Sequence, residues 1–301
     1  MKRLMFEEIE RNKIKSWILI FSFIIIISLI GLLFSYFYDS YSILLIVIFV
    51  SVFYSMIAYN SGDSMILSML GAKEADKIKH ASFINSIQGL AIAAGIPAPK
   101  AYVIEDSALN AFATGKEPKT ASITITTGLL EKLNREELEG VVAHEMSHIK
   151  NYDIRFMMLA VVLAGLITLL SDFFLRSFLY RKRSSNNSRS KGGSAEIIFI
   201  AAGLILAILS PLIGKIIQLA VSRQREYLAD ANSVVLTRNP TGIINALKKI
   251  STDPDPLVDS ANKATAHLFI SSPFKKNTNA INNLFSTHPP INDRIKKLQE
   301  M

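Results

Sequence analysis

Two histidines separated by three residues, with a glutamate after the first, form the strongest chemical motif in this 301-residue chain. The motif is His144-Glu145-Met146-Ser147-His148, and the preceding residues predict a helix that Asn134 and Glu137 begin as a capping box. Positions i and i+4 of a helix lie on one face, so both imidazoles can bind one cation. Glu145 can then take a proton from water on that cation, and the spacing therefore predicts zinc-dependent hydrolysis.

A third ligand for this ion has to come from elsewhere in the chain, because a catalytic zinc takes three protein ligands and leaves one position to water. The chain has no cysteine, so only His, Asp and Glu can supply it. Glu226 and Asp230 form the strongest pair, since they also lie four residues apart on one predicted helix. One carboxylate could bind zinc while the other accepts the N–H of a ligating histidine. A second interpretation stays open, in which both acids belong to a solvated face with Arg225 beside Asp230.

Two long apolar runs near the amino terminus predict membrane-spanning helices. Residues Trp17 to Tyr38 and Tyr41 to Tyr59 contain no charged side chain, and about 20 apolar residues suffice to cross a bilayer as a helix. Two later runs, Phe156 to Ser171 and Ile197 to Gly214, are nearer the lower limit of length. We expect them to span the membrane as well, with a buried or re-entrant hairpin as the alternative for this second pair.

Basic residues set the expected orientation in the membrane. Five of them precede the first run, at positions 2, 3, 11, 13 and 15, whereas the Asp39-Ser40 link between the first two runs has none. Because cytoplasmic flanks carry the excess of Lys and Arg, we expect the amino terminus and the polar parts after Tyr59 to lie in the cytoplasm. Six further basic residues between Leu175 and Glu196 break this rule if the last two runs cross the membrane.

The chain divides into four parts on this pattern. Residues 1–60 hold the basic amino terminus and two spans, and 156–220 hold two further apolar helices with a basic loop between them. Residues 61–155 and 221–301 form the two cytoplasmic parts of the catalytic unit. The helix with His144 and His148 belongs to the first of these parts, and Glu226 and Asp230 belong to the second.

The polar parts mix strands with helices. Residues 101–104 follow a Pro-Ala-Pro turn and 122–126 alternate apolar with polar residues, so both segments predict strands. Helical patterns cover the segments 72–95, 135–150, 241–250 and 290–299. The predicted fold class is a mainly α multi-pass membrane protein with a small α+β domain.

Taken together, these motifs resemble the HtpX-type membrane zinc metallopeptidases, which are relatives of the CAAX prenyl endopeptidases. His144–His148 and Glu226–Asp230 carry the resemblance, with support from Leu109–Gly115 and from the Ser286–Pro290 segment with the Arg-Ile pair behind it. The likeness extends from the first apolar run to about residue 299. One departure is Asn151-Tyr152-Asp153, where the family pattern predicts Asn-Gly-Asp.

The resemblance implies a gluzincin-like site, with one Zn2+ per chain held by His144, His148 and Glu226. Asp230 would then support a ligating histidine from behind. Glu145 would act as the general base on the attacking water.

Substrate contacts also follow from the resemblance. Asn110 and Ala111 would lie on an edge strand to which a substrate backbone adds as a further strand. His288 would stabilise the oxyanion formed during the reaction, and its alternative role is to cap a Pro-Pro turn. His80 and His267 match no motif of the family.

The implied activity is the degradation of damaged or misfolded membrane proteins, as part of proteolytic quality control in the stress response. Its substrates would be membrane-protein or unfolded polypeptide segments, cut at the cell membrane by an active site that faces the cytoplasm. A CAAX-type processing enzyme is a second interpretation, which the short loops and few spans disfavour. A scaffold or pore that binds zinc without catalysis is a third, and the presence of Glu145 disfavours it.

Composition agrees with a membrane protein. Half of the residues are hydrophobic and only 19% are charged, compared with about 25% in soluble domains. The net charge of +8 comes largely from basic residues that flank the apolar runs, at 2–15 and 176–191. Anionic lipid headgroups are the expected partner of such clusters, so we expect a lipid bilayer and no nucleic acid.

Overall fold

Three helices of the chain are long and apolar enough to cross a membrane. The computed structural model describes residues 2–184, 201–206, 223–253, 268–270 and 289–301. Within these ranges the spanning candidates are α1 (Lys2–Phe37), α2 (Tyr41–Met69) and the first part of α6 (Asp153–Ser184). The first three predicted spans are confirmed as apolar helices. Most of the fourth, 197–214, lies outside the described residues.

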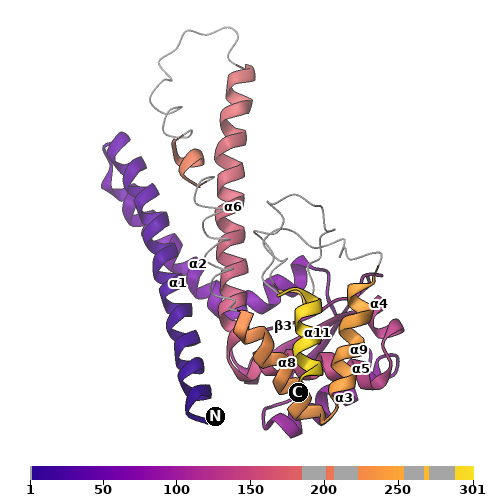
Figure 1. Ribbon diagram of the computed structural model, residues 1–301. Helices are drawn as coiled ribbons and strands as arrows, with labels where there is room; N and C mark the ends of the chain where they lie inside the picture. Colours follow the sequence, from indigo (N-terminus) through magenta and orange to yellow (C-terminus); the bar gives the residue numbers. More distant parts are fainter. Residues whose placement is uncertain (1, 185–200, 207–222, 254–267, 271–288) are drawn as a thin grey trace.

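A tight turn folds α2 back along α1 as an antiparallel pair (Figure 1). Asp39 in the turn has a left-handed backbone conformation with φ 49°, and the Ser35 hydroxyl donates to the Ser40 carbonyl at 3.0 Å. Gly31 lets the two helices approach closely, because a Cβ there would lie 2.8 Å from Val47 Cγ1. Large apolar side chains cover the outward faces of both helices, which suits a hydrocarbon environment.

The polar part is built on a four-stranded sheet in the order β1-β2-β4-β3. Its strands are β1 (Lys73–Glu74), β2 (Lys100–Ile104), β3 (Ala111–Thr114) and β4 (Ser122–Thr126). Strands β2 and β4 run parallel with Ala101 opposite Ile123, and β3 pairs antiparallel with β4 at the end of the sheet. The predicted strands at 101–104 and 122–126 are therefore confirmed.

The helix predicted from residue 72 begins too early. Gly71, just after the end of α2, has a left-handed φ of 66°. Lys73–Glu74 do not continue a helix but pair with β2 as strand β1. Asp76 then accepts two backbone amides of the following turn. Helix α3 (Ala81–Ala94) starts only after this turn, so the prediction over 72–80 is wrong.

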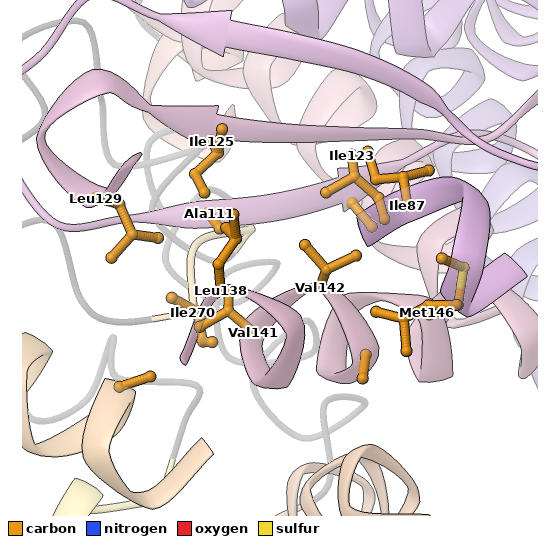
Figure 2. Close-up of a cluster of buried hydrophobic side chains, with 14 of the residues drawn as sticks. Ile87, Ala111, Ile123, Ile125, Leu129, Leu138, Val141, Val142, Met146 and Ile270 are labelled. Carbon is orange, nitrogen blue, oxygen red and sulfur yellow. The ribbon is translucent and has the colours of Figure 1, made fainter. Parts of the chain in front are cut away.

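Helices pack around one face of the sheet and place α5 (Arg135–Lys150) at the centre of the catalytic part. Figure 2 shows Ile123 and Ile125 of β4 facing Val142 and Met146 of α5 in the buried core. The other helices are α4 (Thr127–Lys132), α8 (Arg223–Thr237), α9 (Pro240–Ser251) and α11 (Ile291–Gln299), with a 3₁₀ turn at Pro118–Thr120. The helices predicted at 135–150, 241–250 and 290–299 are confirmed to within two residues.

The opposite face of the sheet packs on the membrane helices. Ile104 of β2 and Phe112 of β3 belong to the same buried cluster as Met158 and Leu159 of α6. Helix α2 runs past residue 60 to Met69, and α6 begins at Asp153. The expected boundaries at 60 and 155 therefore fall inside continuous helices, which connect the catalytic part directly to the spans.

Candidate metal centre and active site

Helix α5 presents the central motif from its last turns. The Asn134 side chain accepts the Glu137 N–H at 2.9 Å, and the Glu137 carboxylate accepts the Asn134 N–H at 2.8 Å, so the predicted capping box is present. The helix is buried on most sides, and His144 and Glu145 are only 0% and 3% exposed. A polar motif at such depth requires compensation from polar partners.

Three potential ligand atoms converge beside this helix. The Nε2 atoms of His144 and His148 lie 3.3 Å apart. Glu226 of α8 brings one carboxylate oxygen to 3.5 Å from His148 Nε2 and the other to 3.7 Å from His144 Nε2. A tetrahedral zinc ion with bonds of about 2.0–2.1 Å keeps its ligand atoms roughly 3.3 Å apart. The two nitrogens and the carboxylate, all within 4.8 Å of one another, therefore fit a metal ion of this kind.

Each of the two imidazoles is held from behind by an aspartate. His144 Nδ1 lies 3.0 Å from Asp230 Oδ1, and His148 Nδ1 lies 2.9 Å from Asp153 Oδ2. An ionised carboxylate can only accept a hydrogen bond, so both Nδ1 atoms donate and both Nε2 atoms keep their lone pairs for the cluster. The proposed support by Asp230 has its counterpart in Asp153, which the sequence reasoning did not assign. Its position five residues after His148, within the Asn-Tyr-Asp segment, is the sequence feature that could have indicated this role.

A buried arginine completes the surroundings of His144. Arg294 of α11 is 0% exposed and donates two hydrogen bonds to Asp230, at 2.8 Å from Nε and 2.6 Å from Nη2. Its Nη2 also lies 3.4 Å from His144 Nδ1. Burial by itself raises the pKa of the Asp230 carboxyl, but the charge and hydrogen bonds of Arg294 outweigh it and hold that pKa well below its usual range.

The charge of Arg294 is fixed in turn by several carboxylates. Burial lowers the pKa of its guanidinium, but Asp230, followed by Glu226 and Glu145, raises that pKa above its usual range. This places Glu145 within electrostatic reach of the same buried site. Sequence reasoning quoted the Arg-Ile pair only as part of a motif and gave Arg294 no role.

The two acids on α8 do not form a solvated face. Glu226 and Asp230 are each 1% exposed. Arg225 forms an ion pair with Asp153 rather than with Asp230. The alternative interpretation of this helix as a charged surface is therefore wrong.

Strand β3 begins with the residues expected to contact substrate. Asn110 immediately precedes it, and the Ala111 carbonyl accepts the Ile270 N–H at 2.9 Å. Ile270 lies beside Ala111 and the first turns of α5 in Figure 2. Phe112 stacks edge-on against Phe269 with ring centroids 5.2 Å apart, and both rings are buried. This edge of the sheet thus carries a short segment of the chain itself.

The remaining histidines are not part of this cluster as far as the structure describes them. His80 precedes α3, where its Nδ1 accepts the Asp76 N–H at 3.0 Å within a local turn. His288 and His267 lie outside the described residues, so the expected oxyanion role of His288 stays a prediction.

The geometry defines what the site can do. It offers two imidazole nitrogens and one carboxylate to a divalent cation, together with a second buried carboxylate on Glu145 beside the first ligand. Such a donor set leaves room for a fourth ligand, as catalytic zinc sites require. Polarisation of a carbonyl and activation of water are the corresponding chemistry.

Comparison with known proteins also indicates a hydrolytic enzyme of the peptidase class. The model of peptidase family M48 matches residues 77–301. Proteins named "Protease HtpX homolog" align along the whole chain. The one from Dictyoglomus thermophilum is 45% identical over 297 residues, which cover 98% of this chain and 94% of its own. The one from Caldanaerobacter subterraneus subsp. tengcongensis is 44% identical, with 100% and 99% covered.

Among solved structures, the crystal structure of S. mikatae Ste24p has a similar fold. The TM-score is 0.50 at 22% sequence identity, and the match covers 97% of this chain and 66% of that chain. At this identity the likeness concerns the fold alone.

Proposed function

Because the chain belongs to peptidase family M48 and to the HtpX-type proteases within it, it is a membrane metalloprotease, and we propose that its metal is zinc, held by His144, His148 and Glu226. The observation that carries this proposal is the convergence of these three ligands while both histidines donate their Nδ1–H to aspartates. That arrangement selects the nitrogen that faces the ion.

Glu145 is the general base in this proposal. Bound among the three ligands, a zinc ion would supply Lewis acidity, which lowers the pKa of water from about 15.7 towards about 7 and polarises the scissile carbonyl. The Glu145 carboxylate takes the proton of the attacking water and delivers it to the leaving amine nitrogen. No residue of the chain needs to form a covalent bond with the substrate.

The other residues orient and stabilise. Asp230 keeps His144 in place and is itself kept ionised by Arg294. Asn110 and Ala111 align the substrate backbone along β3, and His288 stabilises the oxyanion. Because the Ala111 carbonyl accepts the Ile270 N–H, a substrate strand that pairs at this carbonyl has to replace that hydrogen bond.

We assign membrane-protein and unfolded polypeptide segments as substrates, cut at the cytoplasmic face of the cell membrane in quality control under stress. The closeness of the site to the spans supports this choice. His148 lies in the last turn of α5, and the apolar helix long enough to span a membrane begins at Asp153, five residues later. A segment that emerges from the bilayer reaches the cluster without leaving the membrane surface.

Substitutions on α5 and α8 separate the base from the ligands. Glu145→Gln keeps the size of the side chain but cannot accept a proton, so the purified full-length variant should bind one zinc per chain and cleave no casein. His144→Ala, His148→Ala and Glu226→Ala each remove a ligand, so they should lose zinc together with activity. Zinc per chain and casein cleavage are the two measurements.

Glu139→Gln is the matched control, since this glutamate lies on the same helix and pairs with Arg135 at the surface. It should keep both zinc and activity. Casein cleavage by Glu145→Gln at the parent's rate would place the base elsewhere, and full zinc content in Glu226→Ala would place the third ligand elsewhere.

A further inference from the structure

The first membrane helix contributes a fully buried amide to the surroundings of the metal centre. Asn12 lies on α1, five residues before Trp17, and is 0% exposed. Its Nδ2 donates to the Asn151 carbonyl at 2.8 Å and to Asp153 Oδ1 at 2.7 Å. Asn151 caps the end of α5 and Asp153 begins α6, so both partners lie far from Asn12 in the sequence.

Asp153 is the carboxylate that holds His148. One oxygen, Oδ2, receives the Nδ1–H of His148 at 2.9 Å. The other, Oδ1, receives the amide of Asn12 and the ion pair with Arg225 of α8. Each oxygen of Asp153 thus has its own partners, and these partners together fix the carboxylate that holds the His148 ring.

Several further contacts fix Asn12 itself. The Ser16 hydroxyl donates to the Asn12 carbonyl at 2.9 Å. The Lys13 ammonium lies 5.2 Å from the centre of the Tyr152 ring, and the Arg155 guanidinium lies 5.0 Å from the same ring. Tyr152 has a left-handed φ of 59°, so the link between α5 and α6 is held in one conformation against α1.

We propose that Asn12 is a positioning residue of the metal centre. It holds Asp153 so that this carboxylate keeps the His148 Nδ1–H engaged and leaves Nε2 directed at the ion. Helix α1 is then part of the active site and not only a membrane anchor. The inference rests on the proposed function, because it requires His148 to bind the metal.

Zinc affinity tests this role without any measurement of activity. Asn12→Ala in the full-length detergent-solubilised protein removes both donors, and we expect the zinc dissociation constant to rise by about 10- to 100-fold, as for other partners of ligating histidines. Competition with a chromophoric zinc chelator measures it, and thermal unfolding of the metal-free protein confirms that the variant is folded.

Two control variants distinguish positioning from simple packing of α1. Phe23→Ala removes a buried ring of α1 that contacts Tyr54, so it should lower the unfolding temperature and leave zinc affinity unchanged. Asn60→Ala removes an exposed asparagine of α2 whose Oδ1 accepts a hydrogen bond from the Lys116 ammonium, and it should change neither quantity. If Asn12→Ala does not fold, Asn12→Ser provides the same comparison, because its shorter side chain cannot reach both acceptors.

An affinity of Asn12→Ala within about twofold of the parent would overturn the inference, as would a loss that Phe23→Ala reproduces. Failure of both Asn12 variants to fold would overturn it too, since the residue would then serve folding alone. His148→Ala separates this from the proposed function. If that variant loses zinc while Asn12→Ala keeps it, only the inference fails, and if it keeps zinc, the proposed ligand set fails.

Discussion

Two similar series of contacts, each from a histidine to an aspartate to an arginine, meet at the site. His144 donates to Asp230, which Arg294 neutralises, and His148 donates to Asp153, which Arg225 neutralises. A buried carboxylate without a partner costs several kcal/mol, so each arginine offsets the cost of the aspartate that orients a histidine. The two histidines are therefore supported by aspartates that are themselves paired with arginines, and not by single hydrogen bonds alone.

Arg294→Met should destabilise the protein strongly. The change keeps an unbranched, largely apolar side chain but removes the cation that neutralises the buried Asp230 carboxylate, which costs about 3–5 kcal/mol. Thermal and urea unfolding of the metal-free protein in detergent measure the loss. Lys296→Met is the matched control, because Lys296 lies on the same helix but is exposed. Equal stability of the two variants would contradict the buried ion pair.

Sequence spacing located the chemistry but not its supports. The i, i+4 relation identifies His144 with His148 and Glu226 with Asp230, because one helical turn alone brings such residues to one face. Which carboxylate binds the ion required the family resemblance. Asp153, Arg294 and Asn12 act across 5, 64 and 141 residues of sequence, and only tertiary packing brings the more distant of these pairs together.

Helix α5 depends on close backbone contact with α9. A Cβ on Gly140 would lie 2.7 Å from the Ile243 backbone nitrogen, and a Cβ on Gly242 would lie 2.5 Å from the Glu136 carbonyl oxygen. At each glycine the close neighbour is a backbone atom of the other helix, so a side chain at either position could be accommodated only if a helix moved. This contact holds α5, which carries His144 and His148, close against α9.

Gly140→Ala should therefore lower the stability although alanine favours helices. We expect a loss of about 1–3 kcal/mol in the free energy of unfolding from overpacking. Gly89→Ala on α3 is the control, because a Cβ there meets nothing within 4 Å and should stabilise the helix by about 0.5–1 kcal/mol. A stabilised Gly140→Ala variant, measured by thermal unfolding, would contradict the close contact.

The elements were predictable where the pattern is local. Apolar runs located α1, α2 and the first part of α6, and alternation located β2 and β4. Strand β1 escaped because its two residues are both exposed, so no alternation marks it, and its conformation comes from pairing with β2. Helix α2 extends beyond Tyr59 because its carboxyl-terminal end packs against the sheet of the catalytic part.

The whole molecule brings together residues from the start of α1 and residues that follow α2 in the sequence. Asn12 lies near the start of α1, whereas the candidate metal-binding residues follow α2 in the sequence. Figure 1 shows both ends of the described chain near the catalytic part. The turn between α1 and α2 lies at the far end of these helices. The amino terminus, the metal centre and α11 should share the cytoplasmic side.

Single cysteines can test this orientation cleanly, because the natural chain has none. Tyr38→Cys, next to the α1–α2 turn, should react with a membrane-impermeant maleimide in intact cells. Gln299→Cys, at the end of α11, should react only after the cells are permeabilised. The reversed pattern would place the active site outside the cell, and activity of both variants on casein is the control for correct folding.

Because the residues of the candidate metal centre lie far apart in the sequence, the ribosome also makes them at different times. The first two ligands leave the ribosome well before Glu226, and Arg294 follows His148 by 146 residues. At about 5–20 residues per second, roughly 7–30 seconds pass between the synthesis of His148 and that of Arg294, which neutralises Asp230. A nascent chain already inserted in the bilayer therefore carries an incomplete hydrolase. The two histidines and Glu226 therefore have their full set of supporting side chains only after Arg294 has been made.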